Sequence, residues 1–332
     1  MTAPTRPNKE TTMNRAHASL PAWLRLIVAI LVPLLAGLAA AAELKPIRVS
    51  EHAWYVLGDS GMASGANQGF NSNAGFVVTR DSVVVIDALG TPALGEALLA
   101  AIRKISDKPI RRVILTHFHA DHFYGLSAFK AAGAEVWAHR AGRDYFTSGE
   151  AAARLAQRRQ DLFPWVDEST RLVEADHWLD GDTRFEEGGL HFRVSFLGPA
   201  HSSEDLLVGV EEDGVVFCGD ILFAGRIPFV GSADSRRWLA AIDVLAGLKP
   251  QILVTGHGAH STDAGADLTL TRDYLLYLRE QMGRAVDEMI PFDEAYARTD
   301  WHRFSKIPAF EAANRINAYG TYLTLERESL AK

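Results

Sequence analysis

Short apolar runs and amphipathic stretches alternate along most of the chain, and this pattern predicts a mixed α/β (α+β) fold. Runs rich in β-branched residues predict strands at residues 53–57, 75–79, 82–86, 113–116, 134–139, 190–197, 206–210, 215–218 and 252–255. Apolar residues spaced three or four apart predict helices at residues 92–104, 123–132 and 235–248. The alternation of strands and helices indicates β-α-β units.

Beyond residue 264 the apolar spacing predicts helices only. One stripe carries Leu275, Leu278, Met282, Val286 and Met289, and a last helix carries Ile316 and Leu323. We therefore expect a main domain at residues 43–263 and a C-terminal helical extension at residues 264–332. Residues 140–170 form a charged, weakly patterned insertion, which is either a lid over a pocket or a surface excursion.

The first 42 residues have the pattern of a signal peptide. An apolar, Ala- and Leu-rich run at residues 26–42 follows Arg15 and Arg25 and ends on small residues before Glu43. We expect cleavage of residues 1–42 and export of the main domain to the periplasm or the medium. Because the run is about as long as the shortest spanning helix, an uncleaved N-terminal anchor is the alternative, and only then would the chain contact a membrane.

Composition narrows the class of partner. The 332 residues are 48% hydrophobic, which is enough for a large core, and their formal net charge is −7. The chain lacks a Lys/Arg cluster, so we expect no nucleic-acid partner and a small-molecule substrate instead. Cys218 is the single cysteine and cannot form an intramolecular disulfide. No feature of the sequence indicates the oligomeric state.

A dense group of metal-ligand residues follows the predicted strand at residues 113–116. The segment reads Thr-His-Phe-His-Ala-Asp-His, and its potential ligands are His117, His119, Asp121 and His122. Neutral imidazole and carboxylate groups bind divalent first-row metals well. Ligands packed this densely where a strand gives way to a helix are hard to explain by core packing.

Three more ligand-type residues follow predicted strands further along the chain, namely His201, Asp220 and His257. Seven candidates are too many for one tetrahedral zinc ion. Two ions about 3.5 to 4 Å apart that share a carboxylate would use all seven, and such a pair activates a bridging hydroxide. The sequence therefore predicts a dinuclear hydrolase with two Zn²⁺ per chain, for which iron or manganese are the alternative metals.

These residues, in this order and at the ends of strands, resemble the metallo-β-lactamase superfamily over residues 47–262. The resemblance implies a four-layer αββα sandwich with the metals at one edge, between the two sheets. It implies that one ion is held by His117, His119 and His201, the other by Asp121, His122 and His257, and that Asp220 bridges them. Asp87, at the end of a predicted strand, is expected to fix a ligand imidazole.

The resemblance leaves several activities open. The leading hypothesis is a zinc hydrolase of a small ester, thioester, lactone or amide, with Asp121 orienting the hydroxide and passing a proton. Glyoxalase II and the lactonases resemble the chain in the bridging Asp220. Exported class B β-lactamases often carry Cys at that position and Lys at the position of Phe223, and this chain has neither. β-Lactam hydrolysis stays an alternative because another lactamase subgroup uses the pair found here as Asp121 and His122. An iron oxidoreductase similar to the persulfide dioxygenases and a metal-dependent accessory protein are the others.

Overall fold

The computed structural model describes residues 43–231, 233–261 and 263–330. The expected signal peptide or anchor at residues 1–42 lies outside these ranges. Among the helices of the described ranges, none combines the length and hydropathy needed to cross a lipid bilayer.

The first sheet has seven strands that follow one another in chain order. They are β1 (Ile47–Arg48), β2 (Ala53–Val56), β3 (Ala74–Val78), β4 (Val83–Ile86), β5 (Ile110–Ile114), β6 (Glu135–His139) and β7 (His177–Leu179). Neighbours from β1 to β4 pair antiparallel, and those from β4 to β7 pair parallel. Parallel neighbours need crossover connections, so helices separate the later strands.

Three helical crossovers connect the parallel strands. The helices are α2 (Pro92–Arg103), α3 (Ala120–Phe123), α4 (Leu126–Ala131), α5 (Arg143–Thr147) and α6 (Glu150–Asp161), with a 3-10 turn η1 (Arg140–Gly142) before α5. Thr91 caps α2 by accepting a hydrogen bond from the Leu94 amide, and Pro92 fits its first turn. Helix α6 ends at Asp161, shortly before Pro164, which disfavours helical backbone at the residue before it.

The second sheet has five strands in the order β12-β11-β10-β9-β8. Their bounds are β8 (Thr183–Glu187), β9 (Leu190–Phe196), β10 (Leu206–Val210), β11 (Val215–Phe217) and β12 (Ile252–Val254). Only β11 and β12 pair parallel, and the crossover between them contains the 3-10 turn η2 (Gly219–Ile221) and α7 (Ser235–Gly247).

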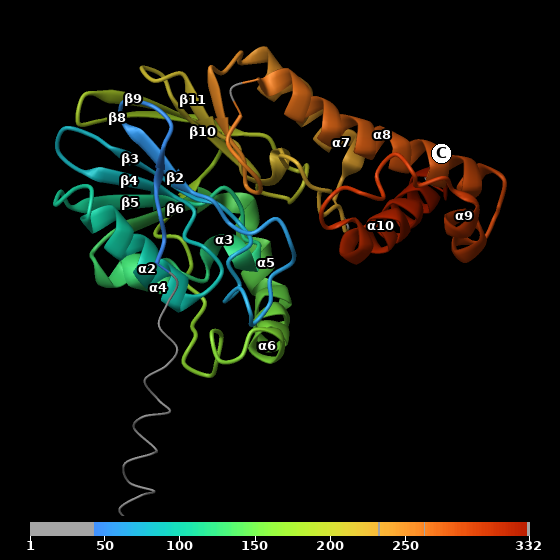
Figure 1. The fold of residues 1–332 in the computed structure, drawn as a ribbon, viewed down its shortest axis with the longest axis horizontal. Helices are drawn as coiled ribbons and strands as arrows, with labels where there is room; N and C mark the ends of the chain where they lie inside the picture. Colours follow the sequence, from blue (N-terminus) through green and yellow to red (C-terminus); the bar gives the residue numbers. More distant parts are fainter. Residues whose placement is uncertain (1–42, 232, 262, 331–332) are drawn as a thin grey trace, which may run out of the picture. The chain divides into compact units, whose positions relative to one another are not determined.

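Successive side chains of a strand point to opposite faces of its sheet, and each face packs against a different layer. In β4, Val83 and Val85 pack with α2 and α4, whereas Val84 and Ile86 pack in the hydrophobic cluster between the two sheets. Helix α7 covers the outer side of the second sheet through a further cluster. The chain thus forms the expected four-layer αββα sandwich, and Figure 1 shows α2 and α4 on the side of β4 and β5, away from β10 and β11.

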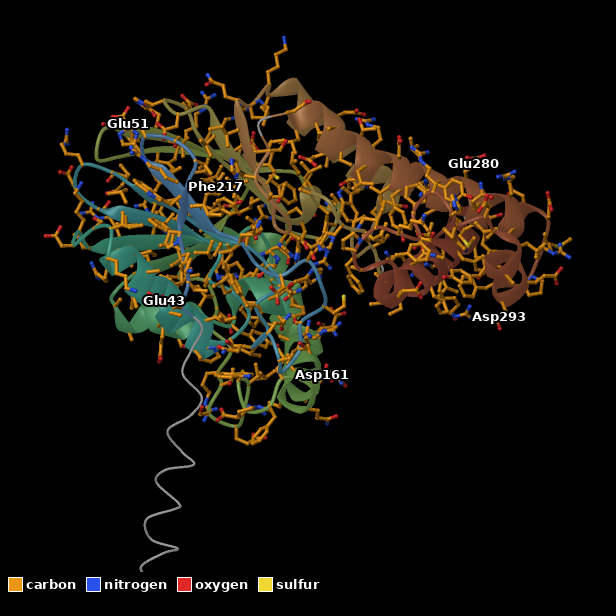
Figure 2. The ribbon with its side chains drawn as sticks, viewed as in Figure 1. Glu43, Glu51, Asp161, Phe217, Glu280 and Asp293 are labelled. Carbon is orange, nitrogen blue, oxygen red and sulfur yellow. The ribbon has the colours of Figure 1, made fainter. Side chains whose placement is uncertain are left out.

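The two sheets approach closely at one glycine. A Cβ atom at Gly75 in β3 would stand 2.1 Å from Cε1 of Phe217 in β11, so only glycine leaves room for that ring. Phe217 is buried, and Figure 2 shows it inside the sandwich, whereas the side chains of Glu280 and Asp293 project from the surface.

The C-terminal helices are α8 (Ala264–Asp287), α9 (Phe292–Arg298) and α10 (Phe310–Leu330). Leu275, Leu278 and Met282 of α8 are fully buried in the same cluster as Trp238 of α7. The predicted extension therefore shares a core with the outer layer of the second sheet. Asn317 of α10 accepts a hydrogen bond from the Val230 amide at 2.7 Å, which connects α10 to the loop before α7.

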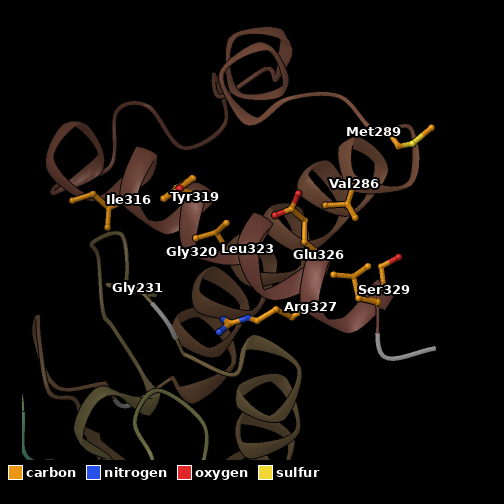
Figure 3. A pocket seen from close by; sticks show the side chains of 11 residues that line it. Gly231, Val286, Met289, Ile316, Tyr319, Gly320, Leu323, Glu326, Arg327 and Ser329 are labelled. Carbon is orange, nitrogen blue, oxygen red and sulfur yellow. The ribbon is translucent and has the colours of Figure 1, made fainter. Parts of the chain in front are cut away.

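Part of the predicted apolar stripe lies at the surface instead of in the core. Helix α8 ends at Asp287, and Met289 follows with a positive φ of 54° and 87% exposure. Ile316 and Leu323 of α10 are 53% and 37% exposed. With Tyr319 and Leu330 they line an apolar groove of about 750 Å³ (Figure 3), so their helical spacing predicts the element but not its burial.

Candidate metal centre

The ligand-rich segment lies where β5 gives way to α3. His117 and His119 follow the strand two positions apart, and the backbone of His119 is extended. Helix α3 begins at Ala120, earlier than predicted, and its first turns carry Asp121 and His122. A short extended segment and one helical turn thus direct four side chains toward one region.

The predicted single helix at residues 123–132 is instead two helices, α3 and α4, separated at Gly125. A Cβ atom at Gly125 would stand 2.0 Å from the Ala88 carbonyl oxygen and 2.8 Å from Cα of Gly95. The Gly125 amide donates to the Leu89 carbonyl at 3.1 Å. Close packing against the loop after β4 therefore interrupts the helix.

The structure brings all seven candidate ligands together in two groups. One group comprises His117, His119, His201 and Asp220, and the other comprises Asp121, His122 and His257. In each group one ligand atom per residue lies within 4.8 Å of the others. Nε2 of His201 and Nδ1 of His119 are 2.9 Å apart, close to the separation of about 3.3 Å between two ligands of a tetrahedral zinc ion.

Asp220 contacts both groups. Its Oδ1 lies 3.2 Å from Nε2 of His122, and its Oδ2 lies 3.2 Å from Nε2 of His201 and 3.3 Å from Nε2 of His257. Asp121 closes the second group, with Oδ2 at 3.5 Å from Nε2 of His257. One carboxylate therefore stands between two clusters of ligand atoms.

The residues fit a metal pair. Several buried ligand atoms lack a hydrogen-bond partner, including Nε2 of His117, Nε2 of His122 and Oδ1 of Asp220. Buried polar atoms without partners are rare because each costs free energy. Five imidazoles and two carboxylates suit divalent first-row ions, and cations would partner these converging atoms.

Burial and mutual charge set the protonation of the cluster. Burial lowers the pKa of His117 well below its usual value and that of His119 to about 3, which keeps both imidazoles neutral. Burial also opposes the charged form of His122, but the carboxylates of Asp220 and Asp87 outweigh it and raise its pKa well above the usual value.

Burial and the neighbouring charges also shift the pKa values of the two carboxylates. Burial would raise the pKa of Asp220, but His257, His122 and His201 hold it well below its usual value. Burial would also raise the pKa of Asp121, but the charges of His122 and His257 outweigh this effect and lower that pKa to about 2. Both carboxylates are therefore ionised at neutral pH, as metal ligands must be.

Hydrogen bonds behind the cluster fix the imidazoles. Asp87 Oδ2 accepts from Nδ1 of His122 at 2.9 Å and from Oγ1 of Thr116 at 2.8 Å, and its Oδ1 accepts from the Thr116 amide at 2.8 Å. Asp87 has a positive φ of 61°, which Asp tolerates better than most residues. The expected contact of Asp87 with a candidate ligand is present, and it directs Nε2 of His122 toward Asp220.

The loop between β2 and β3 supplies contacts that sequence reasoning missed. Nδ1 of His257 donates to the Asn71 carbonyl at 2.6 Å, which leaves Nε2 free to face Asp121 and Asp220. Nδ2 of Asn71 donates to Oδ2 of Asp121 at 3.3 Å, and Ser72 Oγ donates to the Asp121 carbonyl at 2.5 Å. The Asn- and Ser-rich composition of this loop was the only signal available.

Two more features position the cluster. Glu204 accepts a hydrogen bond at Oε1 from the Phe118 amide at 2.9 Å and so holds the backbone between two of the histidines. The indole of Trp238 packs edge-on to the ring of His201, with centroids 4.8 Å apart, and donates to the Ile221 carbonyl at 3.0 Å. Neither residue has a sequence pattern that marks it.

Comparisons with known proteins identify the family and the fold. The profile of the metallo-beta-lactamase superfamily matches residues 67–257. The chain is 24% identical over 252 residues to the linear primary-alkylsulfatase of Pseudomonas sp. (strain ATCC 19151), a match that covers 64% of this chain and 47% of that protein. It is 25% identical over 193 residues to the metallo-beta-lactamase type 2 of Elizabethkingia meningoseptica, which covers 57% of this chain and 69% of that protein.

Solved structures share the fold. The metallo-beta-lactamase from Pontibacter korlensis matches with a TM-score of 0.55 at 22% identity, over 70% of this chain and 99% of its own. The sec-alkylsulfatase Pisa1 from Pseudomonas sp. matches with a TM-score of 0.67 at 18% identity, over 85% of this chain and 50% of its own. The chain thus spans about half the length of the alkylsulfatases that it matches.

Proposed function

The chain belongs to the metallo-beta-lactamase superfamily, and on this premise we propose that it is a dinuclear zinc-dependent hydrolase of a small ester, thioester, lactone or amide. The observation that carries the proposal is the contact of Asp220 with imidazoles of both ligand groups. A carboxylate shared between two ligand sets is what a metal pair requires.

The positions of the seven side chains suggest which metal ion each would bind. His117, His119 and His201 would hold one ion, Asp121, His122 and His257 the other, and Asp220 both. When bound, two zinc ions supply Lewis acidity that lowers the pKa of water and offsets negative charge developing on the substrate. Neither a serine nor a cysteine nucleophile is then needed.

The open side of the cluster lies at two residues. His119 and Asp121 are partly exposed, whereas the other five ligands are buried. Substrate would therefore approach past these two side chains. Asp121 would accept a hydrogen bond from the attacking water there and orient it, and Asn71 donates a hydrogen bond that holds the carboxylate in place.

A sulfate monoester is a second candidate substrate. The observation that favours it is the length of the structural match to the sec-alkylsulfatase, which covers 85% of this chain and so extends beyond residue 257 into the helical part. Hydrolysis of such an ester would need the same metal pair.

Metal analysis with a substrate panel tests the proposal. We expect about two zinc ions per chain, and chelator-sensitive hydrolysis of an aryl ester, a lactone, a thioester, nitrocefin or an aryl sulfate. His117→Ala and Asp220→Asn should lose zinc and activity, whereas His302→Ala, at an exposed histidine of the C-terminal part, serves as the matched control. Iron with oxygen uptake on a thiol persulfide, or full zinc occupancy without turnover, would refute the proposal.

A further inference from the structure

The insertion at residues 140–170 packs against the loop between β2 and β3. Nε1 of Trp165 donates a hydrogen bond to the Gly65 carbonyl at 2.9 Å, across 100 positions of sequence. A Cβ atom at Gly69 would stand 3.1 Å from Cδ1 of Leu162, so the same loop also packs against the residue that follows α6. We call this pair of contacts the clip.

On the insertion side, the clip has a well-held base. Leu162 and Val166 are 2% and 0% exposed and belong to the cluster that covers the first sheet. The Trp165 amide donates to the Leu162 carbonyl at 2.7 Å. Nε of Arg159, in α6, donates to the Asp167 carbonyl at 2.9 Å. The indole therefore projects from a segment that is fixed on both sides of it.

On the loop side, a closed turn carries the acceptor. Oδ1 of Asn67 accepts from the amides of Ser64 and Gly69 at 2.9 and 3.1 Å. The Gly69 amide also donates to the Ser64 carbonyl at 3.0 Å. Because these bonds close the turn at residues 64–69, a displacement of Gly65 is passed on to the end of the turn.

The other end of this loop contacts one of the two ligand sets. Asp121, His122 and His257 form what we call the second site, and His117, His119 and His201 the first. Asn71 hydrogen-bonds to the first and last residues of the second site. Nδ2 of Asn73 donates to the Thr255 and Gly258 carbonyls at 2.8 and 2.7 Å, on either side of its last histidine. Among the described residues, no hydrogen bond of residues 71–73 reaches a histidine of the first site.

The turn itself also lies close to the second site. A Cβ atom at Gly90 would stand 3.0 Å from the Gly69 carbonyl oxygen and 3.1 Å from Cα of Asp121. A single glycine therefore separates the turn from this ligand. Since protein interiors are close-packed, a small shift of the turn would be felt at Asp121.

We propose that the insertion holds the β2–β3 loop against the second site, and that Trp165 is the positioning residue that closes the clip. The inference rests on the proposed dinuclear hydrolase. With the clip closed, Asn71 fixes Asp121 and His257 in the orientation that a cation requires. With the clip open, the loop moves away and the second site loses affinity, whereas the first site keeps it. The insertion thus sets the balance between a dinuclear and a mononuclear centre.

The coupling must act in both directions. If the clip strengthens metal binding at the second site by a given factor, a metal ion there stabilises the clip by the same factor. One net hydrogen bond corresponds to roughly three- to tenfold in an equilibrium constant. We therefore expect an ion at the second site to slow amide exchange at residues 64–69 and 162–166 by about this factor.

Zinc titration of the full chain measures the two sites separately. The titration is buffered with a chelator and followed by NMR through the ring signals of His201 and His257. Trp165→Phe removes the indole donor and keeps an aromatic ring. It should raise the free zinc concentration at the midpoint of the His257 signal by about three- to tenfold and leave the His201 midpoint unchanged. Trp301→Phe is the matched control, because that indole donates to the Tyr296 carbonyl at 3.1 Å in the C-terminal helices.

Hydrogen exchange gives a second readout that does not depend on activity. The zinc-dependent protection of residues 64–69 should fall by about the same factor in Trp165→Phe. Phe163→Ala removes a side chain of the same insertion that is 70% exposed, and should leave both the protection and the two midpoints unchanged.

Two results would overturn the proposal. Unchanged midpoints at both sites in Trp165→Phe would show that the insertion does not act on the centre. Equal shifts at both sites with a lowered melting temperature would show that Trp165 only supports the fold.

The clip and the hydrolase fail in different ways. Unchanged midpoints in a variant that still hydrolyses its substrate would refute the clip alone. A shift confined to His257, in a chain whose wild type binds two zinc ions and hydrolyses nothing, would support the clip and refute the hydrolase.

Discussion

Gly256 lies in the loop after β12 against the carboxylate of Asp220, and a single methyl group there should weaken metal binding at the proposed centre. A Cβ atom at this position would stand 2.0 Å from Oδ1 of Asp220 and 2.7 Å from the carbonyl carbon of Gly219. Carbon and oxygen atoms that are not bonded rarely approach within about 3 Å, so the carboxylate would have to move by roughly 1 Å. The Gly219 backbone has little freedom to yield, since its carbonyl accepts the Gly256 amide at 2.7 Å.

The displacement acts on metal binding more than on folding. Asp220 lies 3.2 to 3.3 Å from three imidazoles, and a shift of this size changes all three separations. We expect Gly256→Ala to weaken zinc binding by about 10- to 100-fold, the range seen when residues that orient ligands are altered. Overpacking should lower the free energy of unfolding by about 1 to 3 kcal/mol.

Chelator competition at neutral pH, followed by metal analysis, measures the zinc affinity, and urea unfolding of the metal-free protein measures the stability. Gly181→Ala is the matched control, because a Cβ atom at Gly181 has no neighbour within 4 Å. Zinc affinity in Gly256→Ala equal to that of the control would show that the bridging position of Asp220 is not essential, and would refute the reasoning.

Three further predictions follow from contacts outside the ligand set. Asp87→Asn should weaken zinc binding by about tenfold in chelator competition, because the amide cannot fully replace the carboxylate that accepts from His122 at 2.9 Å; unchanged affinity would contradict the orienting role. Asn317→Ala should lower the free energy of unfolding by about 1 to 3 kcal/mol in urea, since it leaves the buried Val230 amide without its acceptor; a loss within about 0.5 kcal/mol would argue against it. Burial would raise the pKa of Asp213, but hydrogen bonds from Ser50 and His52 outweigh it and lower that pKa. The Asp213 carboxylate therefore stabilises the fold at pH values above its unfolded pKa of about 4. This contribution is lost as the pH falls through the folded pKa. Asp213→Asn should therefore show a flatter acid limb in a plot of melting temperature against pH, and a limb that matches the wild type would refute this assignment.

The fold and the candidate ligands could be predicted from the sequence because their signal lies in the residues themselves. Buried strands such as β4, with the sequence Val-Val-Val-Ile, carry their signal in their own side chains. The candidate ligands are polar residues that interrupt or follow such strands, and polar side chains at these positions stand out against the apolar runs. These seven residues are therefore recognisable in the sequence.

The edge strands β7 and β8 were not predicted, whereas the edge strand β12 was. Strand β8, with the sequence Thr-Arg-Phe-Glu-Glu, has three charged residues out of five and pairs with β9 through its backbone, which a hydropathy pattern does not detect. Strand β7 is only three residues long. The break at Gly125 was also missed, because the loop that forces it comes from residues 88–89 and leaves no trace in the local periodicity.

Local sequence patterns do not predict the contacts that orient the candidate ligands. Asn71 meets Asp121 across 50 positions of sequence, and Glu204 meets Phe118 across 86. No local preference encodes such pairs, since each depends on where two loops meet in the finished fold. The same limit applies to Ile316, whose helical spacing is that of a core residue although it lines the surface groove.

The core shared by α7 and α8 has a consequence for the dynamics of the chain. Trp238 belongs to that core together with aliphatic side chains of α8, and its indole also packs on the ring of His201, a candidate ligand. Local opening of α8 would remove the packing behind that indole before it disturbed either sheet. The amides of α8 and of the segment around His201 should therefore exchange with solvent deuterium as one cooperative unit. Opening of the C-terminal helices would then limit how long the proposed metal centre stays assembled.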